Sequence, residues 1–118
     1  MAVYLMAHDL GTTGNKATLF SVDGTLVAHT VYPYPTRYFN STWAEQDPRN
    51  WWKAVCETSR RLLEQVPAGD IAAVAFSGQM MGCVCLGKHG ELLRDGIIWA
   101  DQRAVQQAQN LEKDISQQ

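Results

Sequence analysis

The chain has 118 residues, ten of them basic and twelve acidic, for a net charge of −2, a length that suits one modest domain. This near balance gives no reason to expect nucleic acid or an anionic membrane as a partner, and no apolar run is long enough to cross a bilayer. Three cysteines form no disulfide framework, and the N-terminus has no basic segment of a secretory signal, so we expect a cytoplasmic protein.

The first third of the chain predicts three strands joined by tight turns. Residues 3–9 alternate in polarity, residues 15–22 are rich in β-forming side chains, and a third strand is expected over residues 25–32. The turns between them are Gly11-Thr-Thr-Gly14 and Asp23-Gly24, and the second is a strong hairpin signal. This order predicts an antiparallel three-strand meander.

The middle of the chain predicts a loop, a helix and a strand. Residues 36–46 are polar and aromatic and favour a loop. Asp47 then suits a helix N-cap and Pro48 the first helical position, and apolar side chains recur at helical spacing until Pro67. Residues 71–77 are a short apolar run that predicts a buried strand.

The last third predicts a hairpin and a second helix. Residues 82–86 and 91–99 flank a polar turn, which favours a hairpin. Asp101 is a candidate N-cap for a final helix, whose apolar face continues to Gln118 without any C-cap signal. We therefore expect the chain to be the N-terminal part of a longer protein.

Cys83 and Cys85 alternate along the first strand of that hairpin, so both should point to one face. No other cysteine or histidine stands at ligand spacing from them. Two core thiols are therefore a better interpretation than half of a metal site.

The most informative stretch is Asp9-Leu-Gly-Thr-Thr-Gly-Asn-Lys16. Small and hydroxylated residues let backbone N–H groups and hydroxyls approach phosphate oxygens, and a carboxylate at a strand end can hold Mg²⁺ through water beside them. Neither the Walker spacing nor the dinucleotide fingerprint is present, and a strand is expected next, so phosphate would bind at a hairpin turn. The alternative is a plain hairpin turn, in which Asp9 only caps the turn and Lys16 is only solvated.

This octapeptide resembles the first phosphate motif of the FGGY carbohydrate kinases, within the actin, hexokinase and heat-shock chaperone superfamily. Three further segments are similar to that family in the same order: Trp43-Ala-Glu-Gln-Asp-Pro48 with Trp51-Trp52, Ser77-Gly-Gln-Met80, and Trp99-Ala-Asp-Gln-Arg103. The resemblance implies an α/β fold, an incomplete actin-like ATPase or ribonuclease H-like domain whose mixed sheet starts with the meander. Residues 1–118 would be the N-terminal part of the first domain, which binds sugar and phosphate, and the second, ATP-binding domain would lie outside this chain.

The resemblance also implies ATP and Mg²⁺ as cofactors and a small sugar or polyol, such as a xylulose-like ketose, as substrate. Asp9 would be the catalytic residue that organises Mg²⁺, through water, and the transferring phosphate. The residues that would contact the ATP phosphates are Gly11, Thr12, Thr13, Gly14, Asn15 and Lys16. The residues that would line or flank the sugar pocket are Gln79, Met80, Met81, Asp101 and Arg103.

Two departures from the family pattern bear on function. Met81 stands where xylulokinases typically have histidine, so an imidazole contact to the sugar is absent. The family's catalytic base, an aspartate in a later glycine-rich segment, has no counterpart here, so the chain alone should be inactive. Without the resemblance, Met80 and Met81 could be core-filling residues and Asp101 only a helix cap.

Other functions stay open on the sequence alone. One is a non-catalytic module of the same fold that senses sugar or takes part in assembly. Another is a different ATPase of the actin-like superfamily, although the two sugar-site segments argue against it. A homodimer of the full-length enzyme is a further hypothesis.

Overall fold

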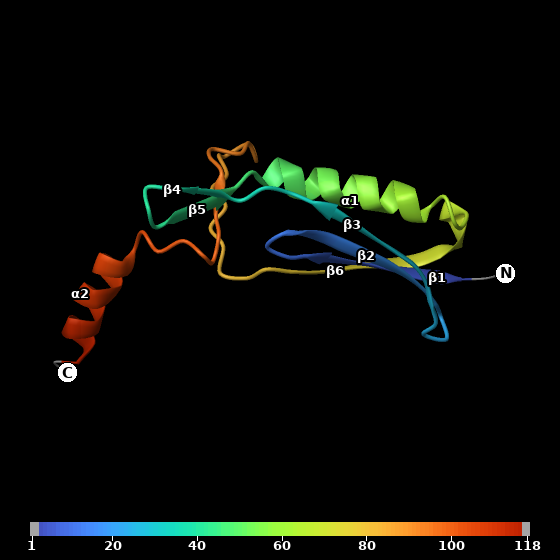
Figure 1. The fold of residues 1–118 in the computed structure, drawn as a ribbon, viewed down its shortest axis with the longest axis horizontal. Helices are drawn as coiled ribbons and strands as arrows, with labels where there is room; N and C mark the ends of the chain where they lie inside the picture. The colour runs from blue at the N-terminus through green and yellow to red at the C-terminus, as the bar shows by residue number, and fades with distance from the viewer. Residues whose placement is uncertain (1–2, 117–118) are drawn as a thin grey trace.

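The computed structural model describes residues 3–116 as an elongated molecule of 63 × 30 × 30 Å (Figure 1). Its radius of gyration is 18.8 Å, whereas a compact domain of this length has about 13.5 Å. The difference arises because the C-terminal helix projects from one end, away from the main sheet. Within residues 3–116, no helix has the length and apolar character needed to span a membrane.

The main sheet has four strands in the order β3-β2-β1-β6. β1 (Tyr4–Leu10), β2 (Gly14–Ser21) and β3 (Leu26–Pro33) form an antiparallel meander, as predicted. β6 (Ile71–Gly78) then pairs in parallel with β1. A meander followed by a parallel fourth strand is the arrangement expected for the actin-like, ribonuclease H-like fold, so the predicted fold class is confirmed.

A second, smaller sheet has the order β4-β5-β7 and consists of Arg37–Phe39, Trp43–Gln46 and Gly96–Ile97. The loop predicted for the stretch before the first helix is therefore wrong, because β4 and β5 form a hairpin there. Its turn uses positive φ at Asn40 (48°) and Ser41 (62°), a backbone region in which asparagine is enriched.

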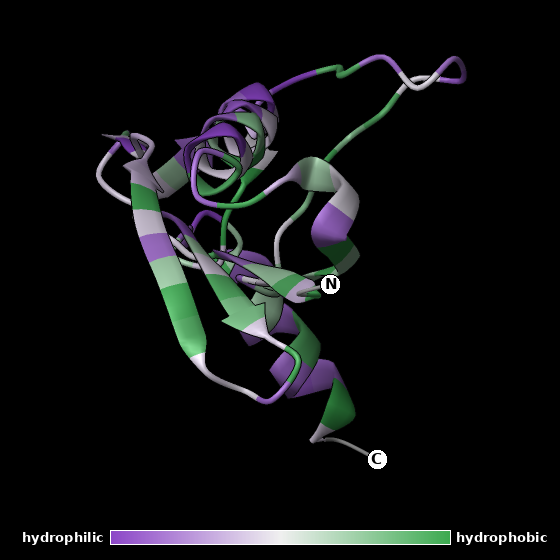
Figure 2. Ribbon diagram, turned by 90° about the vertical axis from the view of Figure 1, so that its right-hand side faces the viewer, coloured by the Kyte–Doolittle hydropathy of each residue, from purple (hydrophilic) through white to green (hydrophobic). Residues whose placement is uncertain are grey.

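Helix α1 (Pro48–Leu62) begins as predicted, with the Asp47 side chain accepting the N–H of Arg49 at 2.9 Å. It ends before the predicted stop at Pro67, and a short 3₁₀ helix, η1 (Ala68–Asp70), leads into β6. α1 covers one face of the main sheet, and its outward side is polar (Figure 2). The core between them contains Met6, Ala17, Leu19, Leu62 and Val66.

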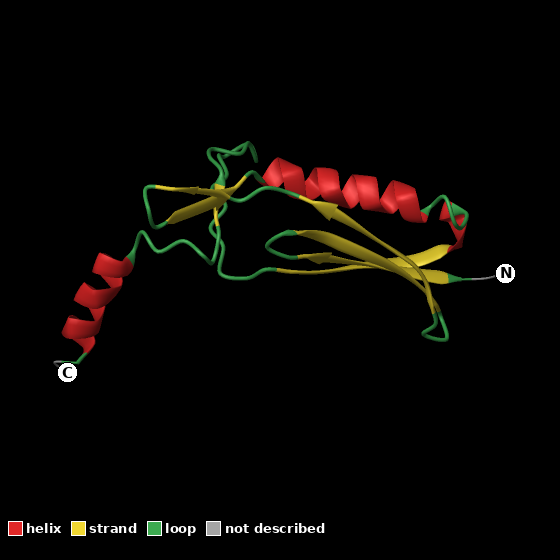
Figure 3. Cartoon of the chain, viewed as in Figure 1, coloured by secondary structure: helices red, strands yellow, loops and turns green. Residues whose placement is uncertain are grey.

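The hairpin predicted after β6 forms only in part. Bridges join Cys83 to Ile97 and Leu86 to Leu92, but most of this segment has no regular structure (Figure 3). The Sγ atoms of Cys83 and Cys85 lie 3.8 Å apart, so the predicted shared face is confirmed. Their predicted burial is wrong, because Cys83 is exposed and Cys85 is half-buried.

Helix α2 (Val105–Ile115) begins later than predicted, with Ala104 at the N-cap position. Asp101 is therefore not its cap. The Asp101 carboxylate accepts the backbone N–H of Ala44 at 2.7 Å and that of Arg103 at 3.0 Å, so it holds the segment before α2 against β5. The predicted helix end at Gln118 lies outside the described residues.

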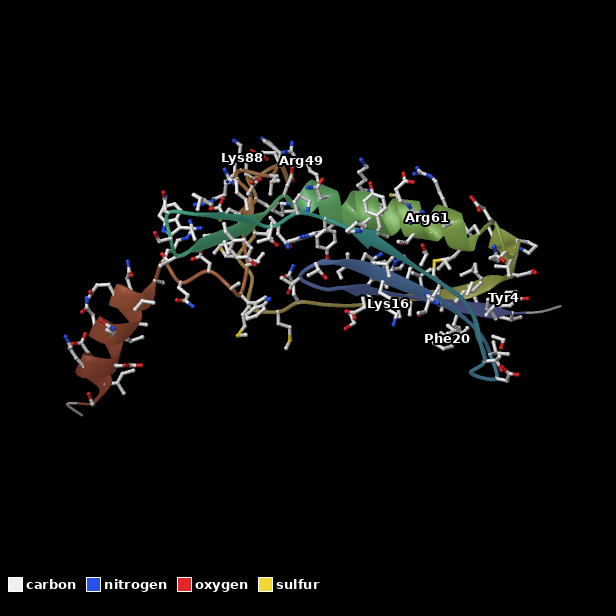
Figure 4. The ribbon with its side chains drawn as sticks, in the orientation of Figure 1. Tyr4, Lys16, Phe20, Arg49, Arg61 and Lys88 are labelled. Atoms are coloured by element: carbon white, nitrogen blue, oxygen red, sulfur yellow. The ribbon has the colours of Figure 1, made fainter. Side chains whose placement is uncertain are left out.

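The face of the main sheet opposite α1 carries exposed side chains in this chain. Lys16 and Phe20 extend from that face (Figure 4). The strand predicted over residues 71–77 forms as β6, but its predicted burial is wrong, because this edge strand is exposed along nearly its whole length, including Val74 and Phe76. The ligand-binding candidates lie where β1 and β6 end.

Candidate functional site

The glycine-rich turn between β1 and β2 has all four of its carbonyl oxygens bonded to protein donors. Backbone N–H groups bond two of them: that of Gly11 donates to the Gly14 carbonyl at 3.0 Å, and that of Tyr34 donates to the Thr13 carbonyl at 3.2 Å. Side chains bond the other two: Gln46 Nε2 donates to the Thr12 carbonyl at 2.6 Å, and the Tyr34 hydroxyl donates to the Gly11 carbonyl. Because a peptide unit is planar and trans, each N–H points away from the carbonyl of the preceding residue. The N–H groups of Thr12 and Thr13 therefore point away from these partners, which is an arrangement suited to an anion.

Tyr34 is a support of this turn that the sequence did not reveal. Burial, together with the negative charge of Asp9, raises the pKa of the Tyr34 hydroxyl to about 12. The hydroxyl therefore stays protonated at neutral pH and remains a donor to Gly11. The surrounding Pro33-Tyr34-Pro35 pattern indicated only the end of a strand.

Asp9 projects from β1 on the sheet face opposite α1. The strand register places it beside Lys16 on β2 and Ser77 on β6, and the three residues line a pocket of about 370 Å³. Within residues 3–116, no group of three or more histidine, cysteine or carboxylate ligands occurs. Asp9 would therefore hold Mg²⁺ only together with water and phosphate oxygens, which is the coordination that Mg²⁺ favours in nucleotide sites. The donor set fits the predicted ion.

A second pocket, of about 410 Å³, brings the predicted phosphate and sugar residues together. Its lining includes Asp9, Gly11 and Thr12 from the phosphate motif and Gln79, Met80 and Met81 from the sugar segment. Two segments about 70 residues apart in the sequence thus share one cavity at the carboxyl ends of β1 and β6. Ligands of open α/β sheets bind at this end of the strands.

Trp99 also lines this pocket, and its indole Nε1 donates to the Thr12 hydroxyl at 2.8 Å. In the sequence, Trp99 is only the first residue of a motif and has no predicted role. The signal in the sequence that could have identified Trp99 as a site residue was this motif, because it places a large aromatic residue two positions before Asp101.

Gln79 lies directly after β6, and its backbone N–H continues the pairing by donating to the Leu10 carbonyl at 2.9 Å. Its side-chain Nε2 donates to Gln46 Oε1 at 2.8 Å. Its own Oε1 is buried and has no hydrogen-bond partner within residues 3–116. Buried acceptors are rarely left unpaired, so this oxygen lacks a donor that the described residues do not supply.

Met80 and Met81 are exposed and line the same pocket, so neither fills the core of this chain. Met81 is 86 % exposed, and its φ of 61° lies in a region that side chains other than glycine seldom adopt. Backbone strain of this kind collects at ligand sites. Both residues also border an adjoining pocket of about 510 Å³ with Trp51 and Val84.

Asn15 points its side chain away from the candidate phosphate site. Its side chain is fully buried beneath α1, where Nδ2 donates to His8 Nδ1 and to Thr58 Oγ1, both at 2.9 Å. Burial lowers the pKa of His8, which keeps that imidazole neutral and its Nδ1 able to accept. The Asn15 side chain therefore faces α1 and not the candidate phosphate site, and a phosphate contact by the rest of this residue stays a prediction.

Position 14 requires glycine for a structural reason that is independent of phosphate binding. A Cβ at this position would lie 2.7 Å from the Tyr32 carbonyl oxygen, closer than real Cβ atoms approach. Close packing against β3 therefore requires glycine here, whether or not a phosphate lies nearby.

Asp101 and Arg103 do not line the pockets described above. Arg103 forms a bidentate pair with Asp101, contacts Glu45 at 2.9 Å, and lies 3.9 Å over the Trp43 ring. The Arg103 guanidinium is the main reason why the pKa of Asp101 falls to about 2. Both side chains fasten the segment before α2 to β5, and their sugar contacts stay a prediction.

The sequence profile described as the FGGY family of carbohydrate kinases, N-terminal domain, matches residues 4–118. The chain belongs to the FGGY family. The resemblance drawn from four short segments is confirmed by this match over nearly the whole chain.

This FGGY chain is 30 % identical over 112 residues to a xylulose kinase of Staphylococcus xylosus, covering 95 % of the chain and 23 % of that relative. It is 31 % identical over 116 residues to a gluconokinase of Bacillus subtilis, and the match covers 98 % of this chain and 23 % of that relative. The crystal structure of a gluconate kinase from Lactobacillus acidophilus superposes with a TM-score of 0.92 at 33 % identity. The superposition covers 97 % of this chain and 23 % of that structure's chain. The chain spans less than a quarter of the length of each.

Proposed function

We propose that the full-length protein carrying this FGGY chain transfers the γ-phosphate of ATP to a hydroxyl of a small sugar, sugar acid or polyol. The observation that supports this proposal is the pocket of about 410 Å³ in which Asp9 and the glycine-rich turn meet Gln79, Met80 and Met81. The names of the relatives, which include xylulose, gluconate and glycerol kinases, support the same class of acceptor.

Phosphoryl transfer requires positioning and charge neutralisation more than covalent chemistry. In this proposal the outward N–H groups of Thr12 and Thr13 and the ammonium of Lys16 bind phosphate oxygens. Asp9 would hold Mg²⁺ through water, and that ion supplies positive charge to the phosphates when bound. The free Gln79 Oε1 accepts a sugar hydroxyl, and the Trp99 indole offers a flat apolar wall to the sugar's C–H face.

The remaining functions belong, in this proposal, to a second domain outside the chain. That domain would supply the adenosine site and the base for the sugar hydroxyl, and its closure would exclude the water that competes as an acceptor. We place the protein in the cytoplasm, where its three free cysteines stay reduced.

The test is the full-length protein with ATP, Mg²⁺ and a panel containing D-xylulose, D-gluconate and glycerol. At least one of them should be phosphorylated, and Asp9→Asn should lower kcat by about 10²–10³ with little change in sugar KM. Asp114→Asn on the exposed α2 is the matched control and should leave kcat unchanged. Absence of turnover on the whole panel, or an Asp9→Asn enzyme within about threefold of wild type, would refute the proposal.

Met81 sets part of the specificity in this proposal. A thioether donates no hydrogen bond and accepts only weakly, so a sugar hydroxyl that faces Met81 loses a partner. An unpaired buried hydroxyl costs about 1–3 kcal/mol, or about five- to 150-fold in kcat/KM. D-xylulose should therefore not be the best substrate of the wild type, and Met81→His should improve it. If D-xylulose is already preferred and histidine brings no gain, Met81 has no such role.

A further inference from the structure

Gln46 ends β5 and is 2 % exposed, yet its side-chain amide makes four hydrogen bonds. Nε2 donates to the Thr12 carbonyl at 2.6 Å and to Thr36 Oγ1 at 2.7 Å. Oε1 accepts from Trp51 Nε1 at 2.9 Å and from Gln79 Nε2 at 2.8 Å. These are all the bonds that an amide can make. One side chain therefore connects the glycine-rich turn to the end of β6.

The partners of Gln46 fix the direction of its amide. The Trp51 indole can only donate and the Thr12 carbonyl can only accept, so Oε1 must face Trp51 and Nε2 must face Thr12. This removes the ambiguity that usually accompanies a glutamine side chain. Gln79 must then present its NH₂ group to Gln46 Oε1, and its own carbonyl oxygen is left to face another direction.

The oxygen left over on Gln79 is the buried acceptor that has no partner within residues 3–116. Gln79 lines the pocket that also contains Asp9 and Thr12. The orientation imposed by Gln46 thus selects a donor, such as a hydroxyl, as the group that satisfies Gln79. The opposite orientation would offer an NH₂ group and select an acceptor.

We propose that Gln46 is a positioning residue that links the position of the phosphate-binding turn to that of the Gln79 carbonyl, so that a shift of one is passed to the other. Through it, a sugar hydroxyl bound at Gln79 favours the turn geometry that binds ATP phosphates, and bound phosphates favour the sugar. This inference rests on the proposed kinase function. It predicts that sugar and nucleotide bind cooperatively and that the cooperativity passes through Gln46.

The experiment uses the full-length protein and three variants of similar side-chain volume. Gln46→Met removes all four hydrogen bonds. Gln46→Glu, in its ionised form, still accepts from Trp51 and Gln79 but has no proton to donate to Thr12. Thr36→Val is the matched control, because it removes only the bond from Gln46 to Thr36 Oγ1, which involves neither the turn nor Gln79.

Cooperativity is measured as the factor by which saturating sugar raises the affinity for the non-hydrolysable nucleotide AMP-PNP, a coupling that typically lies between about five- and 150-fold. We expect Gln46→Met to bring this factor close to one and to lower kcat/KM for the sugar by about tenfold or more. Gln46→Glu should lose the coupling with sugar KM near wild type, and Thr36→Val should retain the coupling. Wild-type coupling in Gln46→Met, or equal losses in Gln46→Met and Thr36→Val, would overturn the proposal.

Hydrogen exchange keeps this test separate from that of the kinase function. If the wild type phosphorylates no sugar in the panel, the proposed function fails, and backbone exchange still decides the role of Gln46. Gln46→Met should speed exchange in peptides covering residues 10–14 and 78–80 together, with β3 unchanged. Unaltered exchange in either peptide would overturn the positioning role.

Discussion

Glu45 is a buried carboxylate that pairs with three arginines. Replacing it should lower the free energy of unfolding, and the size of this loss should depend on how exposed each arginine is. The Glu45 side chain is 3 % exposed and pairs with Arg37 at 2.8 Å, with Arg103 at 2.9 Å, and with Arg94. Burial acts to raise the pKa of Glu45, but the hydrogen bonds from Arg103, Arg37 and Arg94 outweigh it and hold that pKa below its ordinary value. The carboxylate therefore stays charged at neutral pH.

The three arginines do not contribute equally. Arg37 and Arg94 are 60 % and 44 % exposed, and pairs with such exposed groups contribute about 0–1 kcal/mol. Arg103 is 17 % exposed, and a hydrogen bond to a shielded charged group contributes about 1.5–3 kcal/mol. Glu45→Gln keeps one acceptor oxygen, and Arg103 keeps Asp101 as a partner, so we expect a loss of about 2 kcal/mol in the free energy of unfolding.

Urea titration followed by tryptophan fluorescence measures this loss. The matched control is Asp95→Asn, which removes only the 3.4 Å contact to the exposed Arg37 and should change stability by less than about 0.5 kcal/mol. The difference between the variants should persist in high salt, because salt screens buried pairs much less than exposed ones. Equal losses in Glu45→Gln and Asp95→Asn would refute the reasoning that burial decides the contribution.

Three further outcomes are expected. Because Arg103 holds the pKa of Asp101 at about 2, the ionised Asp101 stabilises the fold at pH values above its unfolded pKa near 4. The melting temperature should therefore fall as the pH drops from about 4 through 2. Asp101→Asn should flatten this dependence of melting temperature on pH. Met81→Gly removes the strain of a positive φ and should stabilise the chain by about 1 kcal/mol, whereas a lower melting temperature would show that Met81 is not strained. The Sγ atoms of Cys83 and Cys85, 3.8 Å apart, should bind one trivalent arsenical together, and Cys83→Ser should abolish the binding seen by mass spectrometry.

The sequence predicted the main sheet well because its signals are local. Alternation, the Asp23-Gly24 turn and the Asp47-Pro48 helix start each act within a few residues, and the structure contains all of them. The β4–β5 hairpin was missed because its strands have only three and four residues, too few for alternation to be evident.

The site was predicted less completely, for two physical reasons. Motif resemblance identifies a residue but not the side of the strand it faces. Asn15 and Lys16 are neighbours on β2, so if Lys16 shares a face with Asp9, the Asn15 side chain must face α1. Strand alternation alone thus places the Asn15 side chain on the face opposite the candidate phosphate site. Tyr34 and Gln46 support the turn from more than 20 residues away, and no local pattern carries such a contact.

The exposed strand β6 has a consequence for how this polypeptide behaves on its own. An edge strand offers a row of backbone donors and acceptors to any other strand, and β6 has apolar side chains on both faces and no charged residue between Ile71 and Gly78. Two copies can therefore join their sheets edge to edge while each keeps its native fold. Loss of soluble protein would then rise with concentration even far below the melting temperature, so it would report self-association of folded molecules, not unfolding.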